Sequence, residues 1–304
     1  MNAKKPYNWK RTIFIASFVI VPLTHFLVFY VYVNFNSFFM AFQERVNGKT
    51  VWTFNTMKRV FERLFPLDDE MKEIFKNTFL TFGINFVMYF IGIFVSYFLY
   101  KKIFLHSAFR VLFFLPSILP GVMLCNVYME LIGVNGALAA WVAKISGLAE
   151  PPEFLASPKY ANAAVLINMV WLTFPGNLLI WGGTFSRISD SVLEAAKLDG
   201  VNWLQEAFKI IIPMVWPTFS LLLVMMFAGI FASSGQVFLL TGGNYGTQTL
   251  SSWMYIQVYA TTIDPRSNLF NFMSALGLVI TAVSSVIAIS LRKISSKAFE
   301  GVEY

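Results

Sequence analysis

Residues 191–213 read SVLEAAKLDGVNWLQEAFKIIIP and form a polar-rich interruption between two very apolar parts of the chain. Two pairs of residues in it have the spacing of a helix capping box: Ser191 with Glu194, and Asn202 with Gln205. Such pairs satisfy the free N–H groups of a first helical turn. Gly200 lies between the pairs and can adopt the left-handed conformation that ends a helix. The stretch therefore predicts two short helices, folded back on each other at a membrane surface, before Pro213 opens the next apolar run.

The composition of the whole chain is that of a membrane protein. Of the 304 residues, 57% are hydrophobic, only 13% are charged, and 33 are phenylalanine. A soluble domain of this composition would expose large apolar patches and aggregate. The net charge of +7 comes from basic residues that are dispersed at the ends of apolar runs. It therefore indicates membrane topology rather than nucleic-acid binding.

Six apolar segments have the roughly 20 residues that a helix needs to cross a bilayer, which predicts an all-α polytopic membrane protein. The predicted spans are Ile13–Val33, Asn77–Tyr100, Val111–Ile132, Ala161–Phe185, Met214–Leu240 and Leu269–Leu291. The first span follows basic residues, as a signal peptide does, but it is too long for a signal peptide, so we expect it to be retained. In the third span, Pro116 and Pro120 predict a kink or a break.

The positions of Lys and Arg predict how the spans are oriented. Basic residues in the short loops favour a cytoplasmic N-terminus, a cytoplasmic C-terminus and a cytoplasmic central loop. We expect an N-terminal part with the first span and a long outer loop (1–76), and a core that contains the cytoplasmic loop 187–213 (77–291). A cytoplasmic tail completes the chain (292–304).

The outer loop after the first span is long enough to carry amphipathic helices near the outer surface. Within it, Gly48-Lys49-Thr50 matches the end of a P-loop, but Gln43 stands where that motif begins with glycine, and no strand precedes it. We therefore expect no ATPase site in this chain, and ATP would be bound by separate subunits.

Polar residues in or beside the spans are the candidates for a transport path, since polar groups at membrane depth line a cavity or bond to another helix. They are Asn126, Tyr128, Glu130, Asn168, Ser233, Ser234 and Gln236. Their hydroxyl, amide and aromatic groups suit a sugar. Each is also compatible with a role in holding helices together, and Glu130 with a place at the outer interface.

No catalytic constellation is visible in the sequence. Cys125 stands alone in an apolar run, and His25 has no acidic neighbour, so we interpret both as structural. The sequence predicts a chain that is not an enzyme and that has no cofactor or metal site of its own.

The central loop resembles the EAA loop of ABC importer permeases. That family has EAA, three residues, Gly, nine residues and I-x-L-P, and here Glu194-Ala195-Ala196 and Gly200 keep the spacing, with Ile212 in place of the Leu. Farther on, residues 239–249 resemble the L-T-x-G-G-P…T element of maltose-type carbohydrate permeases, although Asn244-Tyr245 stands where Gly and Pro are usual. The chain is thus identified as a member of the binding-protein-dependent carbohydrate branch.

This resemblance implies a type I ABC importer permease fold in the bacterial cytoplasmic membrane. It also implies a second homologous permease, two cytoplasmic ATPase subunits, an extracellular solute-binding protein and a carbohydrate substrate. The ATPase contact implied for this chain involves Glu194, Ala195, Ala196, Asp199 and Gly200. Another solute, such as a polyol or glycerol phosphate, stays open, although the third to fifth spans offer no Lys or Arg to a phosphate. An ion-driven secondary transporter is a further alternative, but the spans hold almost no acidic or basic residue for ion coupling.

Overall fold

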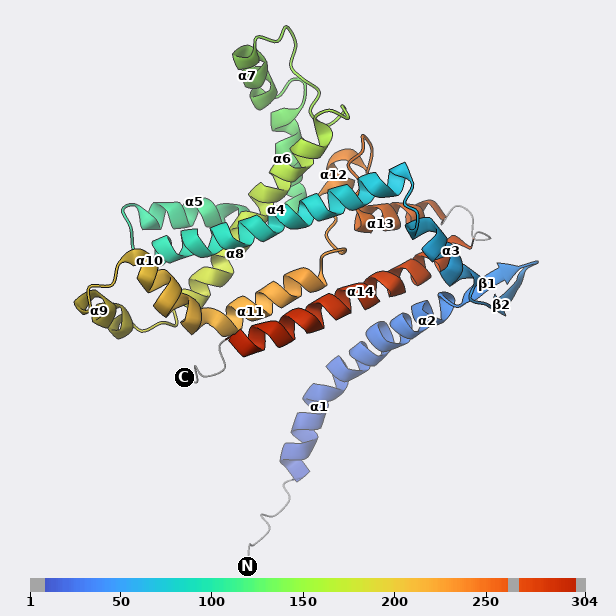
Figure 1. Cartoon of the computed structure of the whole chain (residues 1–304), viewed down its shortest axis with the longest axis horizontal. Coiled ribbons are helices and arrows are strands. Elements are labelled where there is room, and N and C mark those ends of the chain that lie inside the picture. Colours follow the sequence, from blue (N-terminus) through green and yellow to red (C-terminus); the bar gives the residue numbers. More distant parts are fainter. Residues whose placement is uncertain (1–8, 262–267, 299–304) are drawn as a thin grey trace, which may run out of the picture. The chain divides into compact units, whose positions relative to one another are not determined.

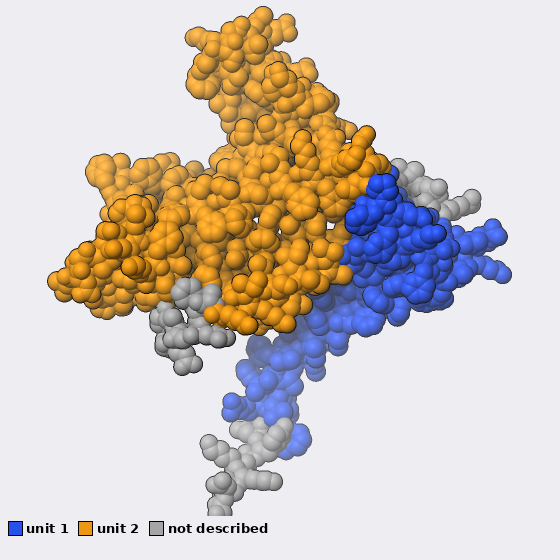
Figure 2. All heavy atoms as spheres, viewed as in Figure 1, with its two compact units in different colours: residues 1–66, 258–279 blue, residues 67–257, 280–304 orange. Residues whose placement is uncertain are grey.

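The computed structural model describes residues 9–261 and 268–298, most of which are helical (Figure 1). The chain forms two compact units, one of residues 1–66 and 258–279 and the other of residues 67–257 and 280–304 (Figure 2). Six helical stretches are long and apolar enough to cross a membrane by their length and composition. The predicted helical membrane protein with six spans is thereby confirmed.

The first unit begins with a continuous helical rod. Its three parts are α1 (Trp9–His25), a π-helical segment (Phe26–Tyr32) and α2 (Val33–Met40). No side chain in these three segments is buried. An apolar helix whose side chains are not buried by the rest of its chain is suited to contact with lipid.

A β-hairpin follows the rod, so the expectation that no strand precedes Gly48-Lys49-Thr50 is wrong. Its strands are β1 (Gln43–Val46) and β2 (Lys49–Trp52), paired antiparallel. Asn47 and Gly48 join them with φ angles of 51° and 78°, as a two-residue Asn-Gly turn requires. The Gly-Lys-Thr triplet is therefore part of a hairpin and not of a P-loop. The amphipathic helix expected in this loop is α3 (Asn55–Leu64), which buries one face.

The second unit contains the longest helices of the core. Its elements are α4 (Asp69–Tyr100), α5 (His106–Ile118), α6 (Gly121–Ile132), α7 (Ala137–Ser146), α8 (Ala161–Phe185), α9 (Asp190–Leu198), α10 (Trp203–Glu206), a π-helical turn (Ala207–Ile211), α11 (Ile212–Ala228) and α12 (Val237–Thr241). Two further helices have residues in both units: α13 (Leu250–Thr261) and α14 (Leu269–Ala298).

Two buried clusters hold the second unit together. In the larger one, Tyr89 of α4, Trp181 of α8 and Phe219 of α11 pack against one another, and their ring centroids lie 5.5 to 6.2 Å apart. The Tyr89 hydroxyl also donates to the Phe219 carbonyl at 2.8 Å. In the smaller one, α6 packs against α8 and α12 around Cys125 and Val165. Aromatic packing and a satisfied hydroxyl together fix the three long helices as a frame.

The third predicted span is broken, as its prolines indicate, but its bounds are corrected by the structure. Helix α5 ends at Ile118, and Leu119 is extended with ψ of 145°. Pro120 has no N–H and disfavours the helical conformation of the residue before it, so α6 starts in a new direction at Gly121. The stretch with the length and composition of a span is 121–146, which adds α7, whereas α5 is a shorter apolar helix.

The fifth predicted span is shifted toward the N-terminus. The helix runs without interruption from Trp203 through the π-helical turn to Ala228, and Gly229 caps it. Residues 229–236 are not helical, because the Ser-Ser-Gly sequence favours local turns over a helix. By contrast, the fourth span agrees with the prediction at both ends, Ala161 and Phe185.

Candidate functional site

The polar stretch 191–213 contains the two short helices that the sequence predicts, but the start of the first differs. Helix α9 begins at Asp190 with Ser189 as its N-cap and without a side-chain capping bond. Ser191 therefore lies inside the first turn, and its hydroxyl pairs with that of Ser189 at 2.8 Å. The predicted capping box of Ser191 with Glu194 is wrong, because the chain becomes helical two residues earlier than the box requires.

Gly200 ends α9 in the left-handed conformation that the sequence predicts, with φ of 70°. The Gly200 N–H donates to the Lys197 carbonyl and the Val201 N–H to the Ala196 carbonyl, both at 3.1 Å. These two bonds form a Schellman motif, which satisfies the last free carbonyls of a helix. The turn reverses the chain within a few residues.

The second helix of the stretch starts with the capping box that the sequence predicts. Gln205 N–H donates to the Asn202 side chain at 2.9 Å, and the Asn202 N–H donates to the Gln205 side chain at 3.2 Å. One residue later, Glu206 is buried and accepts from Lys101, which follows the end of α4, at 2.7 and 2.8 Å. The turn after α9 is therefore anchored to the long helix α4.

Most of the residues implied in the ATPase contact are exposed on α9 and on the turn after it. Glu194, Ala195, Asp199 and Gly200 are exposed, whereas Ala196 is buried. Leu198 lies among them and is 89% exposed. A leucine exposed beside acidic side chains, on a helix held by a rigid turn, is a surface that suits a partner protein.

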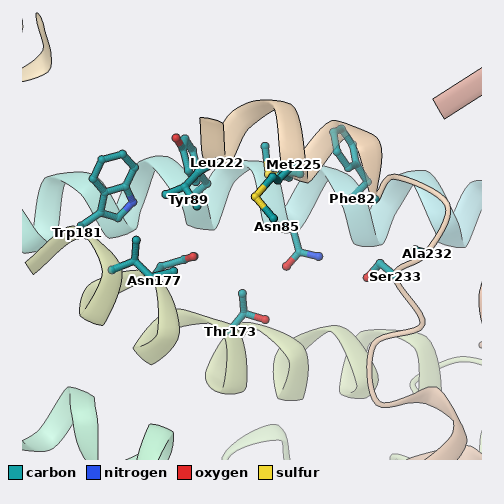
Figure 3. A pocket seen from close by; sticks show the side chains of 13 residues that line it. Phe82, Asn85, Tyr89, Thr173, Asn177, Trp181, Leu222, Met225, Ala232 and Ser233 are labelled. Carbon is teal, nitrogen blue, oxygen red and sulfur yellow. The ribbon is translucent and has the colours of Figure 1, made fainter. Parts of the chain in front are cut away.

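A cavity of about 410 Å³ lies between α4, α8, α11 and the segment after α11 (Figure 3). Its volume falls within the roughly 300–1,000 Å³ that small-molecule sites occupy. In Figure 3 the amides of Asn85 and Asn177 and the hydroxyl of Thr173 are directed into the space from α4 and α8. Ser233 borders it from the segment after α11.

Hydrogen-bonding groups and aromatic rings line this cavity together, without any charge. Its aromatic members are Phe82, Tyr89 and Trp181. In the part of the chain that the structure describes, no Lys, Arg, Asp or Glu contributes to the lining. Such a lining can bond to hydroxyls and stack on an apolar ring face, but it offers no counter-charge to an ion.

The structure brings only one of the seven predicted path residues, Ser233, to this cavity. Tyr128 is buried and donates to the Ala164 carbonyl at 2.8 Å. Asn168 is 0% exposed and accepts from Cys125 at 3.7 Å. These contacts join α6 to α8, so both side chains act between helices.

The other four predicted path residues lie elsewhere. Asn126 and Glu130 are exposed on α6, away from the cavity. Ser234 and Gln236 follow Ser233 in the segment before α12 and are partly exposed. Ser234 donates to the Gly235 carbonyl at 3.3 Å.

Ser233 is the only lining residue that is in the sequence-based path set, and the amide and aliphatic hydroxyl side chains of the lining that the set lacks are those of Asn85, Thr173 and Asn177. Asn85 and Asn177 are amides within apolar sequence, which is the same signal that selects Asn168. Thr173 has no comparable signal, since threonine is common in transmembrane helices.

The glycine-rich segment 239–249 begins in the last residues of α12 and continues from Gly242 as a series of turns on the start of α4. Gly242, Gly243, Tyr245 and Gly246 all have positive φ angles, between 58° and 83°. The buried Asn77 donates to the carbonyls of Gly246 and of Gln248 at 2.7 and 3.1 Å. This segment is fixed in place beside the cavity-forming helices.

Within residues 9–261 and 268–298, no three His, Cys, Asp or Glu side chains are grouped so that they could hold a metal ion.

Apolar helices of spanning length around an uncharged cavity, with a polar turn anchored at one end of the core, define a membrane transport component. Residues 88–301, more than half of the chain, match the family described as binding-protein-dependent transport system inner membrane component. The chain therefore belongs to this family.

Curated relatives agree with this assignment, and a solved structure has a similar fold. The chain is 25% identical to the multiple sugar-binding transport system permease protein MsmF of Streptococcus mutans, over 92% of this chain and 94% of that protein. It is 29% identical to the maltose/maltodextrin transport system permease protein MalF of Vibrio cholerae, over 66% of this chain and 38% of that protein. The fold is similar to that of a chain in a bacterial ABC transporter that imports alginate, with a TM-score of 0.77 at 17% identity, covering 95% of this chain and 96% of that one.

Proposed function

We propose that this chain is a permease subunit of an ATP-driven importer of neutral carbohydrates and forms one half of the translocation path. The observation that carries the proposal is the uncharged cavity, with its amides, hydroxyls and aromatic rings. A sugar is covered with hydroxyls and has an apolar ring face, so it is complementary to such a lining. The names of the curated relatives, which include a lactose and a galactooligosaccharide permease, support the same class of substrate.

In this proposal the path residues are Ser233, as the sequence predicts, together with Asn85, Thr173 and Asn177. Ser234 and Gln236 lie next to Ser233 in the chain and would meet the sugar as it leaves the cavity. Tyr128 and Asn168 would fix α6 on α8. The exposed Asn126 and Glu130 would face the second permease subunit.

Coupling to ATP is assigned to α9 and the turn after it. We propose that α9 sits in a groove of a cytoplasmic ATPase subunit, with Glu194 bonding to basic or hydroxyl groups and Leu198 filling an apolar site. Ala195 allows close approach, while Ala196 packs inward, and the Asp199–Gly200 turn fixes the angle. The pair Lys101–Glu206 then transfers a displacement of the turn to α4.

In this proposal the loop 187–213 and both termini lie in the cytoplasm of a bacterial cell. It requires a second homologous permease, two ATPase subunits that bind the ATP, and an extracellular solute-binding protein. The chain itself would have no ATPase site and would not be an enzyme.

Other cargoes and energy sources receive less support. A glycerol phosphate would need a basic residue in the path, and none lines the cavity within the described residues. A polyol fits the same lining as a sugar, and the uptake test below distinguishes the two cargoes. An ion-driven transporter would need a carboxylate or a lysine in the path for coupling.

The test is uptake by cells that lack this chain and regain it from a plasmid. Labelled mono-, di- and oligosaccharides, a polyol and glycerol phosphate are offered separately. We expect restored uptake of a carbohydrate, insensitive to ionophores and abolished when ATP is depleted. Uptake that collapses with the ion gradient while ATP is maintained would refute the proposed energy source, and restored uptake of glycerol phosphate alone would refute the cargo.

A further inference from the structure

A cationic cavity lies where α4, α5, α8 and α9 meet, and it shares no lining residue with the uncharged cavity of the path. Its volume is about 640 Å³. Its basic lining residues are Lys101, Lys102, His106, Arg110 and Lys197. Lys101 is paired with Glu206. Across the described ranges, no ion pair involves Lys102, Arg110 or Lys197, although Asp190 and Glu194 border the α9 side of the cavity.

An apolar slot adjoins this cavity. The slot has a volume of about 190 Å³ and shares Tyr100, Arg110 and Ser186 with the cavity. Beyond these shared residues its walls are chiefly apolar or small: Leu99, Phe114, Leu178, Leu179, Gly182 and Gly183. An α-helix with its side chains is about 10–12 Å across, so a slot of this volume is too small for a helix but suits a hydrocarbon chain.

The turn beside the cations exposes apolar side chains next to the mouth of the cavity. Between Lys102 and His106, Phe104 is 86% exposed and Leu105 is 54% exposed. The helix α5 that follows runs alongside α4 (Figure 1) and packs on α8, with apolar side chains exposed on its other side. Apolar side chains next to lysine and arginine are typical of the level of lipid headgroups.

We propose that the cationic cavity and the apolar slot together form a groove that binds one anionic glycerophospholipid. The phosphate lies between Lys102 and Arg110, and the first carbons of one acyl chain occupy the adjoining slot. Charge complementarity selects an anionic headgroup. The apolar slot next to the cations selects a lipid over free phosphate, because inorganic phosphate has nothing to place in the slot. Because Glu194 and Lys197 border the same cavity, a bound lipid would touch the α9 loop; this link to coupling rests on the proposed function, whereas binding itself does not.

The test uses the full chain, purified in mild detergent with whatever subunits remain bound, and measures retained lipid by native mass spectrometry. Phosphatidylglycerol and phosphatidylcholine of equal chain length are offered separately. We expect one phosphatidylglycerol to be retained in preference to phosphatidylcholine. Lys102→Gln and Arg110→Gln should each weaken retention about fivefold.

The slot is tested by Gly183→Leu, which should abolish retention by filling it. A Cβ at Gly183 meets no heavy atom within 4 Å, so the variant leaves the helix packing intact. Two matched controls should behave like the wild type: Arg187→Gln, an exposed cation outside the cavity, and Gly176→Leu, an equally open glycine of α8 outside the slot.

The proposal is overturned by equal retention of both lipids, by groove variants that match their controls, or by displacement of phosphatidylglycerol by inorganic phosphate. Cross-linking that finds a helix of the second permease in the groove would also overturn it. The measurement needs no sugar and no ATP, so a failure here and a failure of the proposed transport function remain distinct.

Discussion

The ammonium group of Lys101 lies 2.7 and 2.8 Å from the two carboxylate oxygens of Glu206. Glu206 is only 3% exposed, and the Tyr97 hydroxyl donates to the same carboxylate at 3.2 Å. A buried carboxylate is costly unless a cation and further hydrogen bonds satisfy it. The pair therefore fixes the helix after the α9 turn to the end of α4.

Removing one partner of this pair should destabilise the protein more than removing both. We expect Lys101→Met to lower the free energy of unfolding by about 3 kcal/mol, because Glu206 stays buried without its cation. The double variant Lys101→Met/Glu206→Leu should recover most of this loss. Thermal unfolding in detergent measures both, with Lys209→Met, an exposed lysine of the π-helical turn, as the control. A double variant no more stable than the single one would contradict the role of the pair.

Gly200 should be required for coupling rather than for folding. Its φ of 70° costs an L-residue roughly 1–2 kcal/mol, so Gly200→Val should distort the turn while leaving the spans folded. We expect normal amounts of protein in the membrane, ATP hydrolysis that continues, and uptake that is lost. Gly200→Asn is the matched control, since asparagine tolerates this conformation. Normal uptake with the valine variant would refute this role of the turn.

Gly92 should be required for the close approach of α4 and α8. A Cβ at this position would lie 2.9 Å from the Asn177 Cβ. We expect Gly92→Leu to lower the free energy of unfolding by about 2 kcal/mol through overpacking. Gly83→Leu, on the same helix but with no heavy atom within 4 Å of its added Cβ, should have little effect. Thermal unfolding of the two variants, measured side by side, checks the difference, and equal midpoints would contradict it.

The sequence predicts which segments are helical better than it predicts where each helix begins and ends. Hydropathy sums over some twenty residues, so Ala161–Phe185 is recovered at both ends, and the left-handed Gly200 follows from its own lack of a Cβ. The predicted N-cap of α9, Ser191, is wrong because Ser189 lies two residues before it and either serine can start a helix. Which serine caps the helix depends on how the chain runs from the end of α8 into α9, and the local sequence pattern does not contain that information.

The site was less predictable than the fold, because hydropathy does not show which face of an apolar helix is turned inward. Asn168 and Asn177 are nine residues apart on α8, about two and a half turns, and so lie on opposite faces. Asn168 contacts α6 through Cys125, whereas Asn177 lines the cavity and donates to the Met88 carbonyl of α4 at 3.4 Å. From the sequence alone the two amides are equivalent; only the placement of α6 separates them.

The cavity assignment predicts that a single hydroxyl of α8 contributes to sugar affinity. Thr173 lines the cavity, and Thr173→Val removes its hydroxyl at nearly constant shape. One hydrogen bond contributes about 1 kcal/mol, so the sugar concentration for half-maximal uptake should rise about fivefold.

Thr184→Val is the matched control for this prediction, because Thr184 lies on the same helix outside the cavity and donates to its own helix at the Ile180 carbonyl, 2.9 Å away. Uptake is measured in cells that carry only the variant chain, with protein amounts equalised by immunoblot. If both variants change the uptake affinity equally, or neither does, the sugar does not contact α8 at this level. The sugar would then bond to the other polar groups of the lining, Asn85, Asn177 and Ser233, or follow a path outside this cavity.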